Sequence, residues 1–63
     1  MSDDDEDDAL LVEQAARDLT QQHGPNAADV ARERAEVADT LDDFVAAKTW
    51  RDIADAIDRL QAP

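Results

Sequence analysis

Alanine limits what this 63-residue chain can fold into more than any other residue type, because 13 positions are alanine and each buries little apolar surface. The larger apolar residues after Met1 are Leu10, Leu11, Val12, Leu19, Val30, Val37, Leu41, Phe44, Val45, Trp50, Ile53, Ile57 and Leu60. A chain of this length buries only about 60% of the surface that its unfolded form exposes. We therefore expect a thin core, and either a marginally stable monomer or a homodimer.

The apolar residues recur at intervals of three and four, which is typical of helices, and no segment alternates as a strand would. The spacing predicts helices over about 7–22, 25–41 and 43–61. The predicted fold class is all-α: a small three-helix assembly whose last two helices form an antiparallel hairpin, in a single helical domain over 9–63. One continuous helix through the last two segments is the alternative, since 39–43 contains neither Gly nor Pro.

Turn and cap residues set the predicted boundaries of these helices. Gly24 suits the left-handed conformation that ends many helices, and Pro25 cannot continue the hydrogen-bond ladder of the first helix. Thr40, Asp42 and Asp43 are turn and cap formers, which favours a break between the second and third helices. A continuous helix would also leave two apolar stripes with little to pack on.

The chain begins with a run of six acids, and it carries 17 acidic against 6 basic side chains, which gives a net charge of -11. The members of the run are Asp3, Asp4, Asp5, Glu6, Asp7 and Asp8. Because like charges this close together repel one another, we expect residues 1–8 to form an acidic disordered tail.

The excess of negative charge also limits the classes of partner. Nucleic acids and anionic lipid surfaces contact proteins mainly through Lys and Arg, so we expect neither nucleic acid nor membrane as a partner. The expected partner is an unknown protein that is basic or carries an apolar groove. The six acids of 3–8 would then steer this partner during encounter.

Candidate catalytic and ligand-binding residues are scarce in this sequence. His23 is the only His, there is no Cys, and Ser2 is the only Ser, so we expect no enzyme, no catalytic residues, no metal site and no cofactor. The expected role of His23 is structural, at the negative end of the first helix dipole. The N-terminus has no signal-peptide pattern, and no apolar run is long enough to span a bilayer, so the expected location is cytoplasmic.

Several residues of the helical segments form a recognisable pattern. They are His23, Gly24 and Ala27, then Arg34 and Ala35, then Trp50, Arg51, Ile53, Ala54, Ala56, Ile57 and Leu60. This pattern, HG-x-x-A, then RA, then W-R-x-I-A-x-A-I-x-x-L, resembles one in short uncharacterised alphaproteobacterial all-helical proteins, and it covers 11–61. In those proteins a Gly-Asp turn usually separates the last two helices, where this chain has Asp42 and Asp43. The resemblance implies an all-helical fold and supplies no activity.

The apolar stripe of the third helix is the candidate interface. Its members are Phe44, Trp50, Ile53, Ile57 and Leu60. Trp50 either fills the centre of the core or anchors a partner, since Trp is enriched at binding hot spots. Arg34 lies within the stripe of the second helix, and we expect its stem to cover the core while its guanidinium reaches an acid.

The function that these features favour is protein–protein interaction. The chain would serve as a small acidic adaptor, accessory subunit or regulator that uses an apolar helix face for affinity and its acidic surface for steering. The alternative is a nucleic-acid mimic or antitoxin-like inhibitor of a basic protein. A mimic needs carboxylates that are fixed in order along one face, whereas an adaptor does not.

Overall fold

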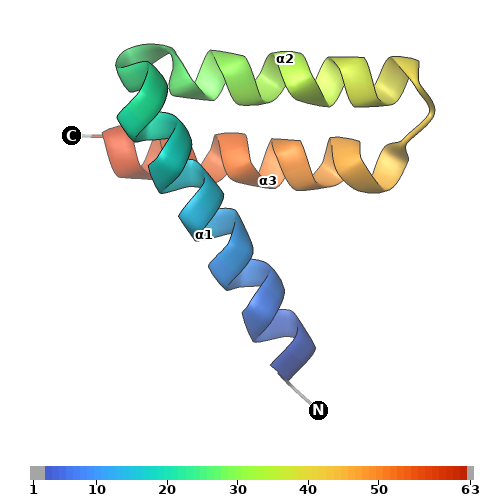
Figure 1. The fold of residues 1–63 in the computed structure, drawn as a ribbon, viewed down its shortest axis with the longest axis horizontal. Coiled ribbons are helices and arrows are strands. Elements are labelled where there is room, and N and C mark those ends of the chain that lie inside the picture. The colour runs from blue at the N-terminus through green and yellow to red at the C-terminus, as the bar shows by residue number, and fades with distance from the viewer. Residues whose placement is uncertain (1–2, 63) are drawn as a thin grey trace.

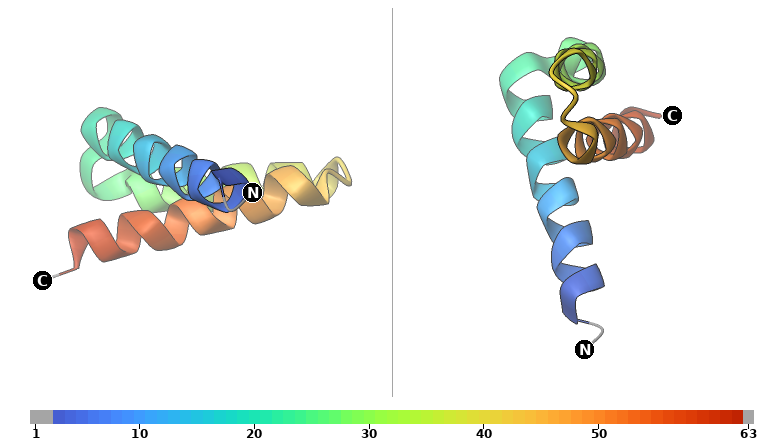
Figure 2. Two further views of the ribbon diagram at one scale, coloured as in Figure 1. Left: turned by 90° about the horizontal axis from the view of Figure 1, so that it is seen from below. Right: turned by 90° about the vertical axis from the view of Figure 1, so that its right-hand side faces the viewer.

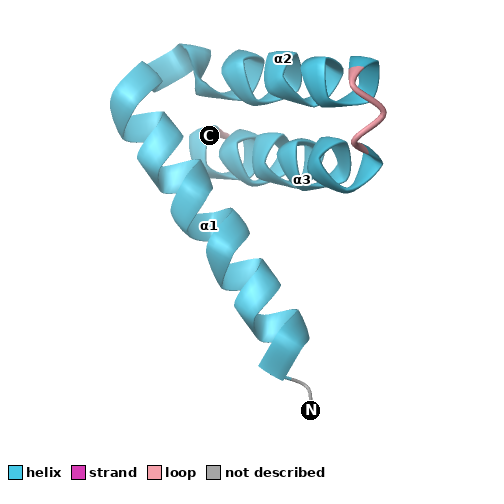
Figure 3. Cartoon of the chain, turned by 45° about the vertical axis from the view of Figure 1, so that its right-hand side comes forward, coloured by secondary structure: helices cyan, strands magenta, loops and turns pink. Residues whose placement is uncertain are grey.

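The structure, a computed structural model, describes the backbone of residues 3–62 and the side chains of residues 10–62. It contains the helices α1 (Asp3–His23), α2 (Ala27–Thr40) and α3 (Phe44–Gln61), and one 3-10 turn, η1 (Gly24–Asn26) (Figure 3). No strand occurs within residues 3–62. The prediction of an all-α fold class is therefore confirmed.

The helices are arranged as a pair with a third helix laid across it. α2 and α3 lie side by side and run in opposite directions, while α1 crosses them near the beginning of α2 and the end of α3 (Figure 1). The N-terminal half of α1 then projects away from the pair, which is seen from two further sides in Figure 2. We call the end of the pair where α1 crosses the covered end, and the end at 41–43 the turn end.

The first helix begins earlier than the sequence analysis placed it. α1 starts at Asp3 in place of about Asp7, so the six acids lie in its first turns, where a tail over 1–8 was expected. Negative residues in a first turn interact favourably with the positive end of the helix dipole, which allows the helix to extend through the run. Met1, Ser2 and Pro63 lie outside the described residues.

The junction between α1 and α2 forms at Gly24. Its φ of 59° is the left-handed conformation that glycine adopts without a steric penalty, as expected for the end of the first helix. The following 3-10 turn delays α2, which begins at Ala27 and not at about Pro25. The Gln61 side chain near the end of α3 donates a hydrogen bond of 2.7 Å to the Gly24 carbonyl, so α3 is tied to this junction.

The turn between α2 and α3 uses aspartate where a glycine is more usual. Asp42 has a φ of 60°, and the next N–H, that of Asp43, donates to the Ala38 carbonyl at 2.8 Å. This bond satisfies a carbonyl that the end of α2 would otherwise leave without a partner. The Asp43 carboxylate then accepts the Ala46 N–H at 3.2 Å, which caps the beginning of α3.

The core is thin and consists mainly of alanine, as the composition predicts. The buried apolar side chains are Ala16 and Leu19 from α1, Ala27, Ala28, Ala31, Ala35 and Ala38 from α2, and Ala47, Ile53, Ala54, Ala56 and Ile57 from α3. Ile57 is the largest side chain that is fully buried. Small side chains allow α2 and α3 to approach closely, but they leave little apolar area to stabilise the fold.

Candidate interaction surface

The five residues of the candidate interface divide into two groups in the structure. Ile53 and Ile57 lie in the core, where a partner cannot reach them, and Trp50 is half-buried against that core. Phe44 and Leu60 are 67% and 51% exposed, and they lie near opposite ends of α3. The structure therefore does not gather the five residues into one surface.

One stripe of α2 passes from buried to exposed along its length. Val30, Arg34, Val37 and Leu41 follow one another at intervals of four, three and four residues, which places them on the same face of the helix. Val30 is half-buried against the core, whereas Val37 is 53% exposed and Leu41 is 73% exposed. The apolar stripe thus continues past the part of α2 that other helices cover.

The beginning of α3 adds two further exposed apolar side chains at the same end of the molecule. Phe44 directly follows the turn, and the next residue, Val45, is 80% exposed. We call the four residues Val37, Leu41, Phe44 and Val45 the turn-end surface. Val37 and Leu41 lie on the side of the helix pair where Arg34 contacts Trp50, whereas Phe44 shares a face with Arg51 and Val45 shares one with Thr49. The four residues therefore surround the turn end and do not form one continuous patch.

Trp50 and Arg34 lie next to the turn-end surface and contact each other. The guanidinium carbon of Arg34 is 5.1 Å from the centre of the Trp50 ring, which is a cation–π contact. Arg34 was expected to reach an acid, and among the side chains of residues 10–62 it forms no ion pair. The half-buried indole offers a face that attracts the cation, so the guanidinium rests there.

The charges around the turn-end surface are predominantly negative. From residue 33 to residue 45 the chain carries five acids, Glu33, Glu36, Asp39, Asp42 and Asp43, and Arg34 is its only base. Asp39 pairs with Arg51 of α3, and one oxygen of Asp43 caps that helix. Glu33, Glu36 and Asp42 have exposed side chains and make no ion pair with a described side chain.

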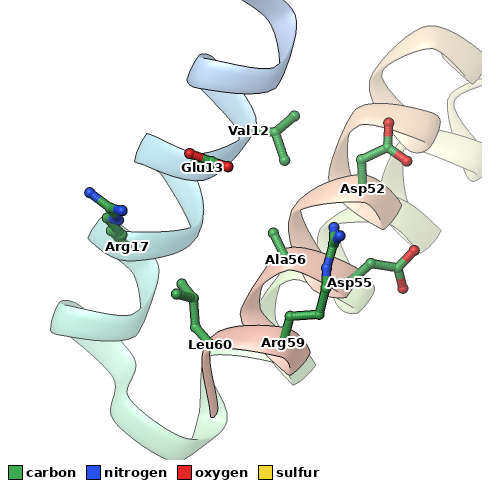
Figure 4. A pocket seen from close by; sticks show the side chains of 8 residues that line it. All are labelled: Val12, Glu13, Arg17, Asp52, Asp55, Ala56, Arg59 and Leu60. Atoms are coloured by element: carbon green, nitrogen blue, oxygen red, sulfur yellow. The ribbon is translucent and has the colours of Figure 1, made fainter. Parts of the chain in front are cut away.

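A second feature, an open groove, lies between α1 and α3 (Figure 4). It is lined by Val12, Glu13, Arg17, Asp52, Asp55, Ala56, Arg59 and Leu60. The side chains of Arg17 and Arg59 point in different directions in Figure 4 and do not converge on one position. Acidic side chains lie among them, so the groove does not have the arrangement of an anion-binding site.

The described residues contain no further candidate for chemistry. Among the side chains of residues 10–62 there is no group of three or more His, Cys, Asp or Glu placed to hold a metal ion. No helix in this part of the chain combines the length and the apolar character that crossing a bilayer requires. His23 is exposed at the end of α1, the position expected from the sequence.

No protein-family model matches the chain, and comparison with curated proteins and with solved structures gave no match. The resemblance to short alphaproteobacterial proteins therefore stays a prediction, and the arguments for function rest on the chain itself.

Three of the four residues of the turn-end surface were not predicted from the sequence as interface residues: Val37, Leu41 and Val45. For Val45 a signal was available, because it shares the polar face of α3 with Thr49 and Asp52 at intervals of four and three residues. Val37 and Leu41 carried no such signal. Both residues belong to the same α2 stripe as the half-buried Val30. How much of this stripe is buried depends on where α1 crosses α2, and the stripe's spacing does not report that position.

Proposed function

We propose that this protein is a small acidic protein–protein interaction module, an adaptor, accessory subunit or regulator, that binds a basic partner in the cytoplasm. The observation that carries the proposal is that four large apolar side chains within residues 37–45 are exposed, at an end of the helix pair where acids outnumber bases. Apolar contact supplies affinity, because it removes apolar area from water. The surrounding charge supplies selectivity for a basic protein.

The folded unit in this proposal is the three-helix assembly, with α2 and α3 as a stable antiparallel hairpin. Two ion pairs between these helices support it: Arg32 with Asp58 at 2.6 Å, and Arg51 with Asp39. These side chains are about half exposed, so each pair contributes little free energy. Because the two pairs connect α2 to α3 at separate positions along the hairpin, they help to fix the alignment of one helix against the other.

Long-range attraction is the second part of the proposed function. A net charge of -11 on so small a protein speeds encounter with a basic partner, and this attraction weakens as salt shortens the Debye length to about 8 Å at physiological ionic strength. The acidic run of α1 lies on its projecting half, away from the hairpin (Figure 1). Its proposed role is steering, while the apolar contacts form elsewhere.

The test compares three forms of the tagged protein as baits in an extract of the source cells. They are the wild type, the double variant Leu41→Ser/Phe44→Ser, and the matched control Leu10→Ser/Leu11→Ser, whose wild-type leucines are 54% and 64% exposed on α1. We expect a basic protein that the wild type and the control retain and that the turn-end variant loses.

The same baits also show how the proposal would fail. If no protein distinguishes the three baits at low and at physiological salt, the interaction function is wrong. If a captured partner is released by duplex DNA in proportion to DNA concentration, the mimic or antitoxin-like inhibitor becomes the better description.

A further inference from the structure

We propose that the open groove between α1 and α3 is the interface through which two copies of this chain form a symmetric dimer (Figure 4). The occupant of the groove is therefore a second molecule with the same groove, turned so that the two grooves run in opposite directions. This inference does not involve the turn-end surface, so it can fail while the proposed interaction function stands.

The charges that line the groove follow the same order on both of its walls. On α1 the acid Glu13 comes four residues before Arg17, and on α3 the acid Asp55 comes four residues before Arg59. Both helices run towards the Gly24 junction, because α1 ends there and the end of α3 donates a side-chain hydrogen bond to the Gly24 carbonyl. The bases therefore lie towards the junction on both walls, and the acids lie farther from it.

This order makes the groove complementary to itself. A two-fold rotation that sets one groove against another in the opposite direction places Glu13 of each copy opposite Arg17 of the other. On the second wall it places Asp55 opposite Arg59, and each contact occurs twice because the dimer is symmetric. Two grooves that ran in the same direction would set acid against acid and base against base, so charge selects the antiparallel arrangement.

The charged side chains that the dimer would pair are available for these contacts. Glu13, Arg17, Asp55 and Arg59 are exposed, and none of them forms an ion pair with another side chain of residues 10–62. The remaining acid of the groove, Asp52, already pairs with a Lys of α3 at 3.2 Å. Association through the groove would therefore add ion pairs without breaking a described one.

Apolar side chains between the charges supply the contact area. They are Val12 from α1, and Ala56 and Leu60 from α3. Leu60 is 51% exposed, and its side chain extends into the space between the two helices (Figure 4). Contact with a second copy would remove this apolar area from water, which favours association.

The thin core and the net charge act on this dimer in opposite directions. Small domains that bury little apolar area are commonly stabilised by oligomerisation, whereas a net charge of -11 on each copy opposes it. The groove itself has three acids against two bases, so most of the excess charge lies elsewhere. Because the two α1 helices run in opposite directions, their acidic runs lie at opposite ends of the dimer, and a Debye length of about 8 Å at physiological salt screens repulsion over that distance.

The first test measures the mass of the full-length protein by sedimentation equilibrium at physiological salt. We expect the mass to change from that of a monomer to that of a dimer between about 1 µM and about 1 mM protein. The melting temperature should rise over the same range, because association favours the folded chain by mass action. A mass that stays monomeric at the highest concentration would refute the dimer.

Charge reversal tests which residues face each other. The acidic variant is Arg17→Glu/Arg59→Glu, and the basic variant is Glu13→Arg/Asp55→Arg. Each variant alone sets like charges against each other, so it should dimerise at least about tenfold more weakly than the wild type. An equal mixture of the two should form a heterodimer with an affinity within about threefold of the wild-type dimer. Both variants keep a negative net charge, so their overall charge does not attract one to the other.

Two further variants test the apolar contact and the position of the interface. Leu60→Ser should weaken dimerisation about tenfold, whereas Leu41→Ser/Phe44→Ser is the matched control at the turn end and should leave it within about twofold of the wild type. The replaced side chains are at least half exposed, and circular dichroism melts report whether each variant still folds.

Three results with these variants would overturn the inference. If the acidic and basic variants each dimerise as tightly as the wild type, the charges of the groove do not face each other. If their mixture forms no heterodimer, the antiparallel pairing is wrong. If Leu41→Ser/Phe44→Ser abolishes self-association, the interface lies at the turn end. Capture of a basic protein from the extract is measured separately, so none of these results decides the interaction function.

Discussion

The two ends of the α2–α3 pair differ in how far their apolar residues are exposed. At the covered end Ala27, Ala31 and Ile57 are fully buried, while at the turn end Val37 and Leu41 are 53% and 73% exposed. The difference comes from α1, which crosses only the covered end and is joined to it through the Gly24 junction (Figure 1). An apolar stripe on α2 or α3 therefore shows which face of the helix favours apolar contacts. Whether those contacts form within the molecule depends on whether α1 covers that part of the stripe.

The largest expected difference between the two ends is in stability. Ile57→Ala should lower the free energy of unfolding by about 2–5 kcal/mol, because it leaves a cavity at a fully buried position. That loss is comparable with the whole stability of a small domain, about 5 kcal/mol or less. Leu41→Ala, at the turn end, should change it by less than about 0.5 kcal/mol. Urea unfolding followed by circular dichroism measures both, and equal losses would mean that the turn end is also part of the core.

A smaller effect is expected at the boundary between the two ends. Trp50→Ala removes packing against the core and the cation–π contact with Arg34, and because the indole is only half-buried we expect a loss of about 2 kcal/mol. Arg34→Gln should remove only the contact, at a cost of about 0.5–1 kcal/mol. Thermal melts of the two single variants and the double variant give the coupling energy. A value near zero would show that the Arg34 guanidinium does not interact with the ring in solution.

The two junctions should respond in opposite directions to substitution. Gly24 and Asp42 both have φ near 60°, so Gly24→Ala should destabilise the fold by about 1 kcal/mol, whereas Asp42→Gly should leave it unchanged or stabilise it slightly. A Cβ at position 24 would meet nothing within 4 Å, so the expected cost comes from the backbone conformation alone. Chemical denaturation measures both changes. Destabilisation by Asp42→Gly would indicate that the carboxylate itself stabilises the turn.

Salt should produce the smallest effect, and it acts on both ends together. The net charge of -11 makes the folded chain repel itself, and added NaCl screens this repulsion, so we expect the melting temperature to rise by a few degrees between dilute buffer and about 0.15 M NaCl. Scanning calorimetry over a salt series tests this. A fall in melting temperature would mean that the ion pairs of Arg32, Lys48 and Arg51 outweigh the net repulsion.

The sequence predicted the all-α class and the residues of both junctions, because Gly24, Asp42 and Asp43 carry strong local preferences. It did not predict that α1 begins at Asp3, since repulsion within the acidic run and its favourable position near the helix dipole oppose each other. It also could not separate Ile53 and Ile57 from Phe44 and Leu60. The spacing of the apolar residues in α3 shows which face of that helix is apolar. It does not show which part of that face α1 covers.

A core built from alanine also fixes how the chain tolerates substitution. Ala16, Ala27, Ala31 and Ala47 have no exposed surface, and their side chains are already so small that truncation to glycine removes only one methyl group. Enlargement is the harmful direction, because each added methylene pushes closely packed helices apart. Among sequence variants that still fold, these four positions should hold only Gly, Ala or Ser, whereas positions 41, 44 and 45 should accept almost any residue unless selection for a partner restricts them.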